Sequence, residues 1–156
     1  MNTLKIGDKA PIFRLPNQHG ESVDLADLLK QHRVLVYFYP KAMTPGCTVQ
    51  AQNLRDHKDQ LQAENTIAVG ISPDASKRLA KFAERDELNF LLLADEDHQV
   101  AEAFGVWGLK KFMGREYDGI HRISFLIEQD GTISQVFDKF KTKDHHQVVL
   151  DALHAI

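Results

Sequence analysis

Cysteine is almost absent from this sequence: Cys47 is the only one among 156 residues, so no disulfide can form within the chain. That scarcity is typical of a reducing compartment. Long hydrophobic runs are also missing, since the longest one, residues 34–39, is far too short to cross a bilayer. The first five residues lack the apolar core of a secretory signal. We therefore expect a cytoplasmic protein that does not work in a membrane.

No large excess of either charge is present. The chain has 19 basic and 22 acidic residues and a formal net charge of -3. Without a basic stripe or an arginine-rich arm, nucleic acid is not an expected partner. Charged residues make up 26% and apolar residues 43% of the chain, which is ordinary for a globular protein. The length predicts a single domain over residues 1–156.

The eight histidines do not form a metal-binding pattern. His145 and His146 are adjacent, so on a helix their side chains would point about 100° apart and could not easily share an ion. Residues 95–98 (Asp-Glu-Asp-His) contain ligand types, but a solvated acidic turn is the simpler interpretation. We expect neither a metal nor a cofactor.

Short apolar runs alternate with helical patterns along the chain. Strands are expected at residues 33–39, 66–71, 90–93, 123–127 and 132–137, and an N-terminal hairpin from residues 13–15 and 22–24. Helical faces are expected from Cys47, Ala51, Leu54 and Leu61, after the helix-start residues 72–74, around 100–104, and from Val149, Ala152, Leu153 and Ile156. This alternation predicts an α/β sandwich with a partly parallel central sheet, to which the Asp130-Gly131 hairpin adds antiparallel pairs.

Residues 40–47 (Pro-Lys-Ala-Met-Thr-Pro-Gly-Cys) are the segment best suited to chemistry. A buried strand ends at Pro40, a short loop follows, and Cys47 opens a helix. The free N–H groups and the positive dipole end of that helix stabilise an anion, and the thiolate is the nucleophilic form of cysteine. Cys47 could instead be a small core residue, because free cysteines are often buried. The strand–loop–helix setting favours a reactive thiol.

Residues 37–48 resemble the signature P-x-x-x-T-x-x-C of peroxiredoxins, and more narrowly the peroxiredoxin Q, or bacterioferritin comigratory protein, branch. The likeness continues through residues 7–11, 70–72, 104–108 and 117–127. The resemblance implies a thioredoxin-like three-layer sandwich with a mixed central sheet and an N-terminal β-hairpin extension. It also implies an antioxidant thiol-dependent peroxidase, acting on hydrogen peroxide and organic hydroperoxides, and it favours a monomer.

Four residues match the catalytic positions of that family. The resemblance implies that Cys47 attacks one peroxide oxygen and becomes a sulfenic acid, that Thr44 orients the peroxide, and that Pro40 shields the pocket from water. Arg122 would supply a fixed positive charge from a distant strand, favouring the thiolate and the leaving oxygen. From the residues alone, Thr44 could equally be a helix cap and Arg122 a partner in a surface ion pair.

Gln52 occupies the position, five residues after Cys47, at which many members of this branch carry a resolving cysteine. With no second cysteine, the sulfenic acid must be reduced by an external thiol such as glutathione, a glutaredoxin or thioredoxin. Until then it is exposed to further oxidation. The alternative function is a thioredoxin-fold redox sensor or binding module oxidised at Cys47, and a third possibility is a member of the fold without thiol chemistry.

His121 and the segment 105–119 each have more than one interpretation. His121 could act as an acid or base beside Arg122, or with Cys47 in a hydrolase, although a structural role is simpler. The Gly-rich segment 105–119 could rim the site and accept alkyl peroxides through Trp107, Phe112 and Met113. Ordinary aromatic burial instead favours a loop that packs these side chains onto the core.

Overall fold

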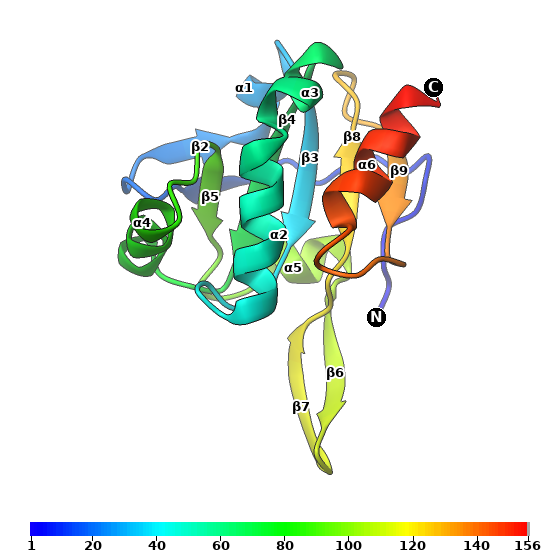
Figure 1. Cartoon of the computed structure of the whole chain (residues 1–156). Coiled ribbons are helices and arrows are strands. Elements are labelled where there is room, and N and C mark those ends of the chain that lie inside the picture. The colour runs from blue at the N-terminus through cyan, green and yellow to red at the C-terminus, as the bar shows by residue number, and fades with distance from the viewer. Residues whose placement is uncertain (156) are drawn as a thin grey trace.

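A five-stranded mixed sheet forms the centre of the computed structural model, which describes residues 1–155 (Figure 1). In spatial order the strands are β5 (Leu91–Ala94), β4 (Thr66–Ser72), β3 (Arg33–Phe38), β8 (Ser124–Ile127) and β9 (Ile133–Phe137). β3 pairs in parallel with β4 and antiparallel with β8, so the predicted mixed sheet is confirmed. The central position of β3 explains why its residues form a nearly unbroken apolar run.

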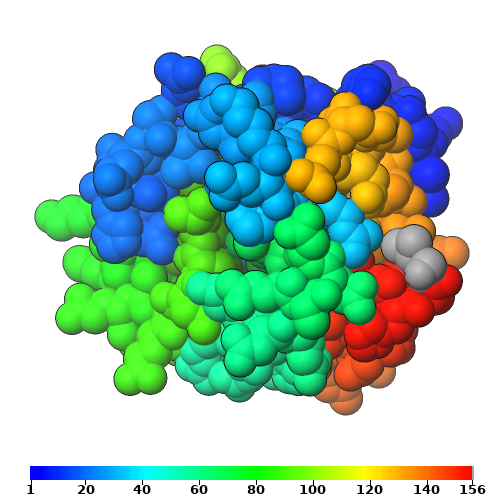
Figure 2. Space-filling model, turned by 90° about the horizontal axis from the view of Figure 1, so that it is seen from above, coloured from blue at the N-terminus to red at the C-terminus, as the bar shows by residue number. Residues whose placement is uncertain are grey.

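Outer layers cover both faces of the sheet. One layer holds α2 (Pro45–Asp56), α3 (Lys58–Ala63), α4 (Ser76–Arg85) and α6 (His145–His154). The other holds α1 (Leu25–Leu29), α5 (Gln99–Phe104) and the N-terminal hairpin of β1 (Arg14–Pro16) and β2 (Ser22–Asp24). Figure 2 shows the N-terminal segment and α1 on one side of the molecule, and α3 and α6 on the other. This is the predicted thioredoxin-like sandwich.

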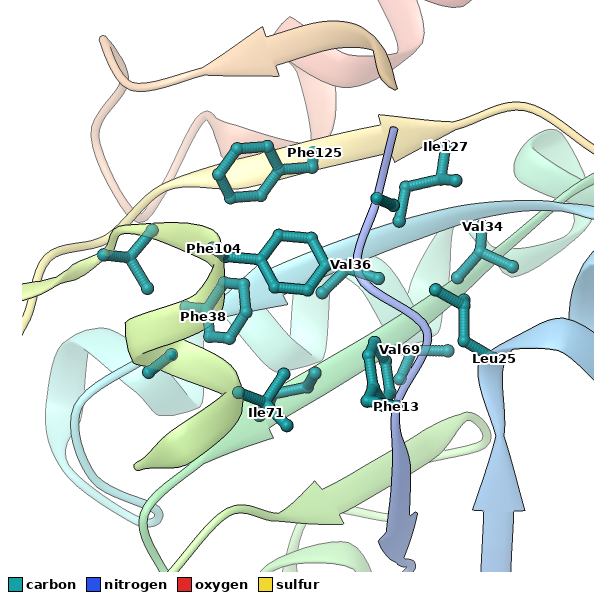
Figure 3. Packing of buried hydrophobic residues seen from close by; sticks show 14 of the residues in the cluster. Phe13, Leu25, Val34, Val36, Phe38, Val69, Ile71, Phe104, Phe125 and Ile127 are labelled. Atoms are coloured by element: carbon teal, nitrogen blue, oxygen red, sulfur yellow. The ribbon is translucent and has the colours of Figure 1, made fainter. Parts of the chain in front are cut away.

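Alternating side chains of β3 build both halves of the hydrophobic core. Val34, Val36 and Phe38 point to the layer that contains α1 and α5, where Figure 3 shows them among Phe104, Phe125 and Ile127. Leu35 and Tyr37 point to the opposite layer, together with Cys47 and the apolar faces of α2 and α6. The strand that leads to the predicted catalytic loop is therefore fixed from both sides.

The segment predicted as a loop after Gly105 is a long hairpin of β6 (Trp107–Phe112) and β7 (Arg115–Ile120), which projects from the body of the molecule (Figure 1). Its turn consists of two residues, Met113 and Gly114. Both have positive φ angles, of 51° and 77°, as so tight a turn requires. Phe112 is 65% exposed, so the prediction that the aromatic residues of this segment pack onto the core is wrong for Phe112. Trp107 stacks on the ring of His98 at 3.8 Å between centroids.

Other element boundaries also differ from the prediction. The helical face that begins at Cys47 is divided between α2 and α3, which are separated at His57. α4 begins at Ser76 rather than at residues 72–74, because Asp74 binds the neighbouring loop instead of capping the helix. Ile156, predicted for the last apolar stripe, lies outside the described residues. No helix within residues 1–155 is long and apolar enough to span a membrane.

Candidate active site

Cys47 lies in the first turn of α2, directly beyond the loop that follows β3. Pro45 takes the first helical position, where the missing N–H of proline costs no hydrogen bond. The side chain of Cys47 is 1% exposed and belongs to the core cluster on this side of the sheet. The predicted strand–loop–helix setting is therefore observed, and the sulfur is covered rather than open to solvent.

Arg122 reaches Cys47 from the connection between β7 and β8. Its Nη2 lies 3.1 Å from Sγ of Cys47, and its Nη1 donates to Oε1 of Gln50 at 3.1 Å. Gln50 is itself 1% exposed and holds the guanidinium in place. Within residues 1–155, no carboxylate forms an ion pair with Arg122, so the interpretation as a surface ion pair finds no support. The charge of the guanidinium is directed at the sulfur.

Gly46 allows this close approach. A Cβ atom built on Gly46 would lie 3.2 Å from Nη2 of Arg122 and 3.5 Å from the side chain of Thr142. Any larger residue would compete with the guanidinium for the space next to Cys47. The glycine that precedes the cysteine is therefore part of the geometry of the site.

Thr44 and Pro40 lie at the two ends of the loop that precedes α2. Thr44 is the N-cap residue by position, but its side chain makes no capping hydrogen bond. Its hydroxyl donates instead to the carbonyl oxygen of Lys41 at 2.9 Å, which leaves the lone pairs of that oxygen available to a further donor. Pro40 is half-buried just after β3, where it cannot continue the sheet.

A buried carboxylate that was not predicted as a site residue supports the loop. Oδ2 of Asp74 accepts from the backbone N–H of Ala42 at 2.7 Å and from the hydroxyl of Ser72 at 2.7 Å. Arg78 pairs with Asp74 at 3.2 Å and donates to the carbonyl of Ala42 at 2.8 Å. These contacts hold the next residue, Met43, in a left-handed conformation with φ of 67°. The Ser-Pro-Asp pattern of residues 72–74 signalled a helix start, which concealed this role.

Lys110 lies on β6 of the projecting hairpin, and its side chain reaches back to the base of the hairpin. Its Nζ donates to the carbonyl of Ile120 at 2.8 Å, and Ile120 precedes Arg122 by two positions. Burial lowers the pKa of Lys110, the positive charge of Arg122 lowers it further, and the negative charge of Cys47 opposes both effects. No sequence motif pointed to this lysine, because its approach to the site depends on a hairpin that was not predicted.

Three buried titratable side chains near the site, Tyr37, Tyr39 and His145, are uncharged. Burial raises the pKa of both Tyr37 and Tyr39, so neither phenol ionises near neutral pH. Burial also lowers the pKa of His145 to about 3, which keeps its ring neutral. Arg122, in contact with the sulfur, and Lys110 are therefore the two cations described beside these neutral groups.

No general base is apparent for the alternative chemistries. Nε2 of His121 bonds to the carbonyl of Leu109 at 3.1 Å, which fastens the projecting hairpin to the body. Among the described contacts, no histidine reaches Cys47. Residues 1–155 also contain no cluster of three or more His, Cys, Asp or Glu side chains that could hold a metal. A cavity of about 390 Å³ lies at the other end of α2, beside Leu54, Lys58 and Phe90, and does not include Cys47.

Together, a sandwich of this layout and a buried cysteine faced by arginine at a helix N-terminus define a thioredoxin-like protein built for chemistry at one thiol. Comparison with known proteins then gives the family: residues 6–136 match the AhpC/TSA family, and the chain belongs to it. It is 63% identical to the peroxiredoxin Bcp of Escherichia coli over 153 residues, covering 98% of this chain and 97% of that one. Such relatives are thiol-dependent peroxidases, and this chain is one of that class.

Solved structures agree with this placement. Peroxidoxin BcpB of Mycobacterium tuberculosis superposes with a TM-score of 0.88 at 36% identity, covering 98% of both chains. The bacterioferritin comigratory protein of Xanthomonas campestris, studied for alkyl peroxide reduction activity, superposes with a TM-score of 0.85 at 29% identity, covering 92% of this chain and 90% of that one. The resemblance drawn from the sequence is confirmed.

Proposed function

We propose that this chain reduces hydrogen peroxide and organic hydroperoxides at Cys47, and that an external thiol such as glutathione, a glutaredoxin or thioredoxin completes each cycle. The contact between Arg122 and the sulfur, at 3.1 Å, is the observation that carries the peroxide step. The external-thiol step is inferred from the sequence, which contains one cysteine. Alkyl peroxide reduction described for the Xanthomonas campestris relative supports the inclusion of organic substrates.

In the first step the thiolate of Cys47 attacks one oxygen of the hydroperoxide ROOH. An S–O bond forms, the O–O bond breaks, Cys47 becomes Cys–SOH, and RO⁻ leaves and takes up a proton to give ROH. Arg122 stabilises the charge that builds on the leaving oxygen, because its guanidinium is fixed before the reaction begins. The free lone pairs of the Thr44 hydroxyl accept the O–H of the hydroperoxide, and Pro40 limits the entry of water.

In the second step a thiol R′SH reduces the sulfenic acid. Cys–SOH and R′SH form the mixed disulfide Cys–S–S–R′ and release water, and a second thiol displaces Cys47 as R′S–SR′ forms. No second thiol of the chain can replace R′SH, because Cys47 is the only cysteine and residue 52 is glutamine. A reducing compartment such as the cytoplasm supplies the required thiols.

We also propose that the protein acts as a single-domain monomer. The residues proposed for the peroxide step, Cys47, Thr44, Pro40 and Arg122, all come from one chain. One hydrophobic cluster draws on residues from the N-terminal segment to β9, and the other draws on residues from β3 to α6. The two clusters share the central strands, which supports the proposal of a single domain.

Stopped-flow measurement of peroxide consumption tests the proposal. Wild-type protein should consume one equivalent of hydrogen peroxide far faster than free cysteine does, and should turn over repeatedly with at least one of glutathione plus glutaredoxin or thioredoxin. The matched variant Cys47→Ser should be inactive with every donor. Oxidation of Cys47 no faster than that of free cysteine would refute the peroxidase, whereas fast oxidation without turnover and a mixed disulfide with one protein would favour the sensor.

A further inference from the structure

One face of α2 is tied to the end of α4 by a set of side chains next to the catalytic cysteine. Thr48, Gln52 and Arg55 recur at helical spacing on α2, and Arg85 and Asp86 lie opposite. We call these five residues the α2–α4 clamp. Nothing in the peroxide step uses them, although Thr48 directly follows Cys47 in the sequence.

Asp86 is the centre of the clamp. Its side chain is 8% exposed, and each of its carboxylate oxygens has a partner. Nε2 of Gln52 donates to Oδ1 at 3.0 Å, and Nε of Arg85 donates to Oδ2 at 2.9 Å. The backbone carbonyl of Asp86 accepts from Nη1 of Arg55 at 2.6 Å.

Arg85 completes the connection by donating to the hydroxyl of Thr48 at 2.8 Å. The clamp therefore spans the helix from the residue after Cys47 to its last turn. Hydrogen bonds to charged groups contribute more to stability than hydrogen bonds between neutral groups, because each charge must find a partner when it is removed from water. Movement of the start of α2 away from the sheet would break the Thr48 contact first and the Gln52 contact next.

The two proposed chemical steps place opposite demands on this helix. The peroxide step needs α2 in place, because Arg122 must remain 3.1 Å from the sulfur. The thiol step needs the sulfur to be reached by a second sulfur atom, although Cys47 is 1% exposed when the helix is in place. An incoming thiol, above all one on a protein, can react only when the first turns of α2 open.

We propose that Asp86 is a positioning residue that, through Gln52, Arg85 and Thr48, holds α2 closed over Cys47 and so limits the thiol step. This inference rests on the proposed external-thiol step. Gln52 thus has a role of its own at the position where many relatives carry a cysteine: it strengthens the closed helix. The sulfenic acid consequently stays covered for longer between the two steps.

Labelling of Cys47 tests the clamp without peroxide. Because the chain has one cysteine, a bulky maleimide reports the opening of α2 at that residue alone. Gln52→Ala removes one hydrogen bond to a buried carboxylate and should accelerate labelling roughly tenfold. Gln52→Glu should accelerate it further, because it sets two carboxylates against each other. Gln60→Ala, at an exposed glutamine of α3, should label at the wild-type rate.

Two controls separate local opening from general destabilisation. Ile133→Val trims a buried side chain in the other core cluster, and it should leave the labelling rate unchanged despite its lower stability. Labelling of Gln52→Ala should depend only weakly on low concentrations of urea, because a local opening exposes little surface. Wild-type labelling rates in both Gln52 variants, or equal acceleration in Ile133→Val, would overturn the inference.

The enzymatic steps then connect the clamp to function. With the sulfenic acid formed in advance, Gln52→Ala should react roughly tenfold faster with thioredoxin, while its oxidation by hydrogen peroxide should not be faster than that of the wild type. An unchanged thiol step despite faster labelling would also overturn the inference. If wild-type Cys47 itself resists peroxide, the proposed function fails, and the labelling result still decides whether the clamp exists.

Discussion

The guanidinium Nη2 of Arg122 lies 3.1 Å from Sγ of Cys47, although 75 positions separate the two residues in the sequence. Both side chains are positioned by the central strands, because the loop after β3 leads to Cys47 and Arg122 precedes β8, the antiparallel neighbour of β3. The peroxide site thus depends on a single strand pairing for its main electrostatic contact.

Arg122→Met should lower kcat/KM for hydrogen peroxide by roughly 10²–10³-fold, the usual cost of losing one fixed donor to a developing oxyanion. Arg122→Lys should lose less, because it keeps the charge but not the planar fork that also binds Gln50. Stopped-flow oxidation measures both variants. Equal losses in the two would show that geometry, rather than charge, dominates. An unchanged rate in Arg122→Met would contradict the proposed role.

Thr44→Val should reduce the rate of the peroxide step by at least about tenfold, whereas Thr44→Ser should retain most of it. Both effects follow from the hydroxyl, which donates to Lys41 and so offers its lone pairs to the substrate. A residue that transfers a proton as a general acid or base raises the rate by about 10²–10⁴-fold, and a residue that only orients the substrate, such as Thr44, contributes less. Full activity in Thr44→Val would leave Thr44 with a purely local role in the loop.

Lys110→Met should reduce the preference of Cys47 for anionic reagents. The ratio of alkylation rates with iodoacetate and with iodoacetamide should fall by about threefold to fivefold, the effect of roughly 1 kcal/mol of Coulomb energy. Lys111→Met is the matched control on the same strand, because Lys111 is exposed and pairs with Glu116 at 3.6 Å. An equal fall in both variants would mean that the effect is one of net charge alone.

The sequence predicted the central part of the fold because its signals are local. The apolar run of β3, the end of that strand at Pro40 and the Asp130-Gly131 turn each act through neighbouring residues. The same holds for Cys47 at the start of a helix. The projecting hairpin was not predicted, because its strands are exposed and lack the apolar alternation that identifies a half-buried strand.

The residues that support the site were not predicted either, and the reason is a different one. Asp74, Asp86 and Gln50 act through partners that only the folded chain brings near, and each has an ordinary local interpretation as a cap, a helix end or a helix interior residue. Arg122 was identified through its resemblance to a family motif rather than through any local pattern. Its location is a connection between strands, rather than the strand that was predicted.

The stability of the fold should fall in acid partly because of His145. Its ring is fully buried, its Nε2 lies 2.8 Å from the hydroxyl of Ser124, and burial lowers its pKa to about 3. An unfolded chain binds a proton at an ordinary histidine below about pH 6.5, while the folded chain does not until pH nears 3. The free energy of unfolding contributed by this residue is therefore constant above pH 6.5 and decreases as the pH falls from there toward 3.

His145→Asn should make the free energy of unfolding less dependent on pH in this window, since asparagine can still bond to Ser124 and does not titrate. Urea unfolding at intervals from pH 4 to 8 measures the difference, which should approach a slope of about 1.4 kcal/mol per pH unit well below pH 6.5. The exposed His154→Gln is the control and should follow the wild type. Parallel curves for His145→Asn and wild type would show that the ring accepts a proton inside the fold, so that α6 must move at its first turn.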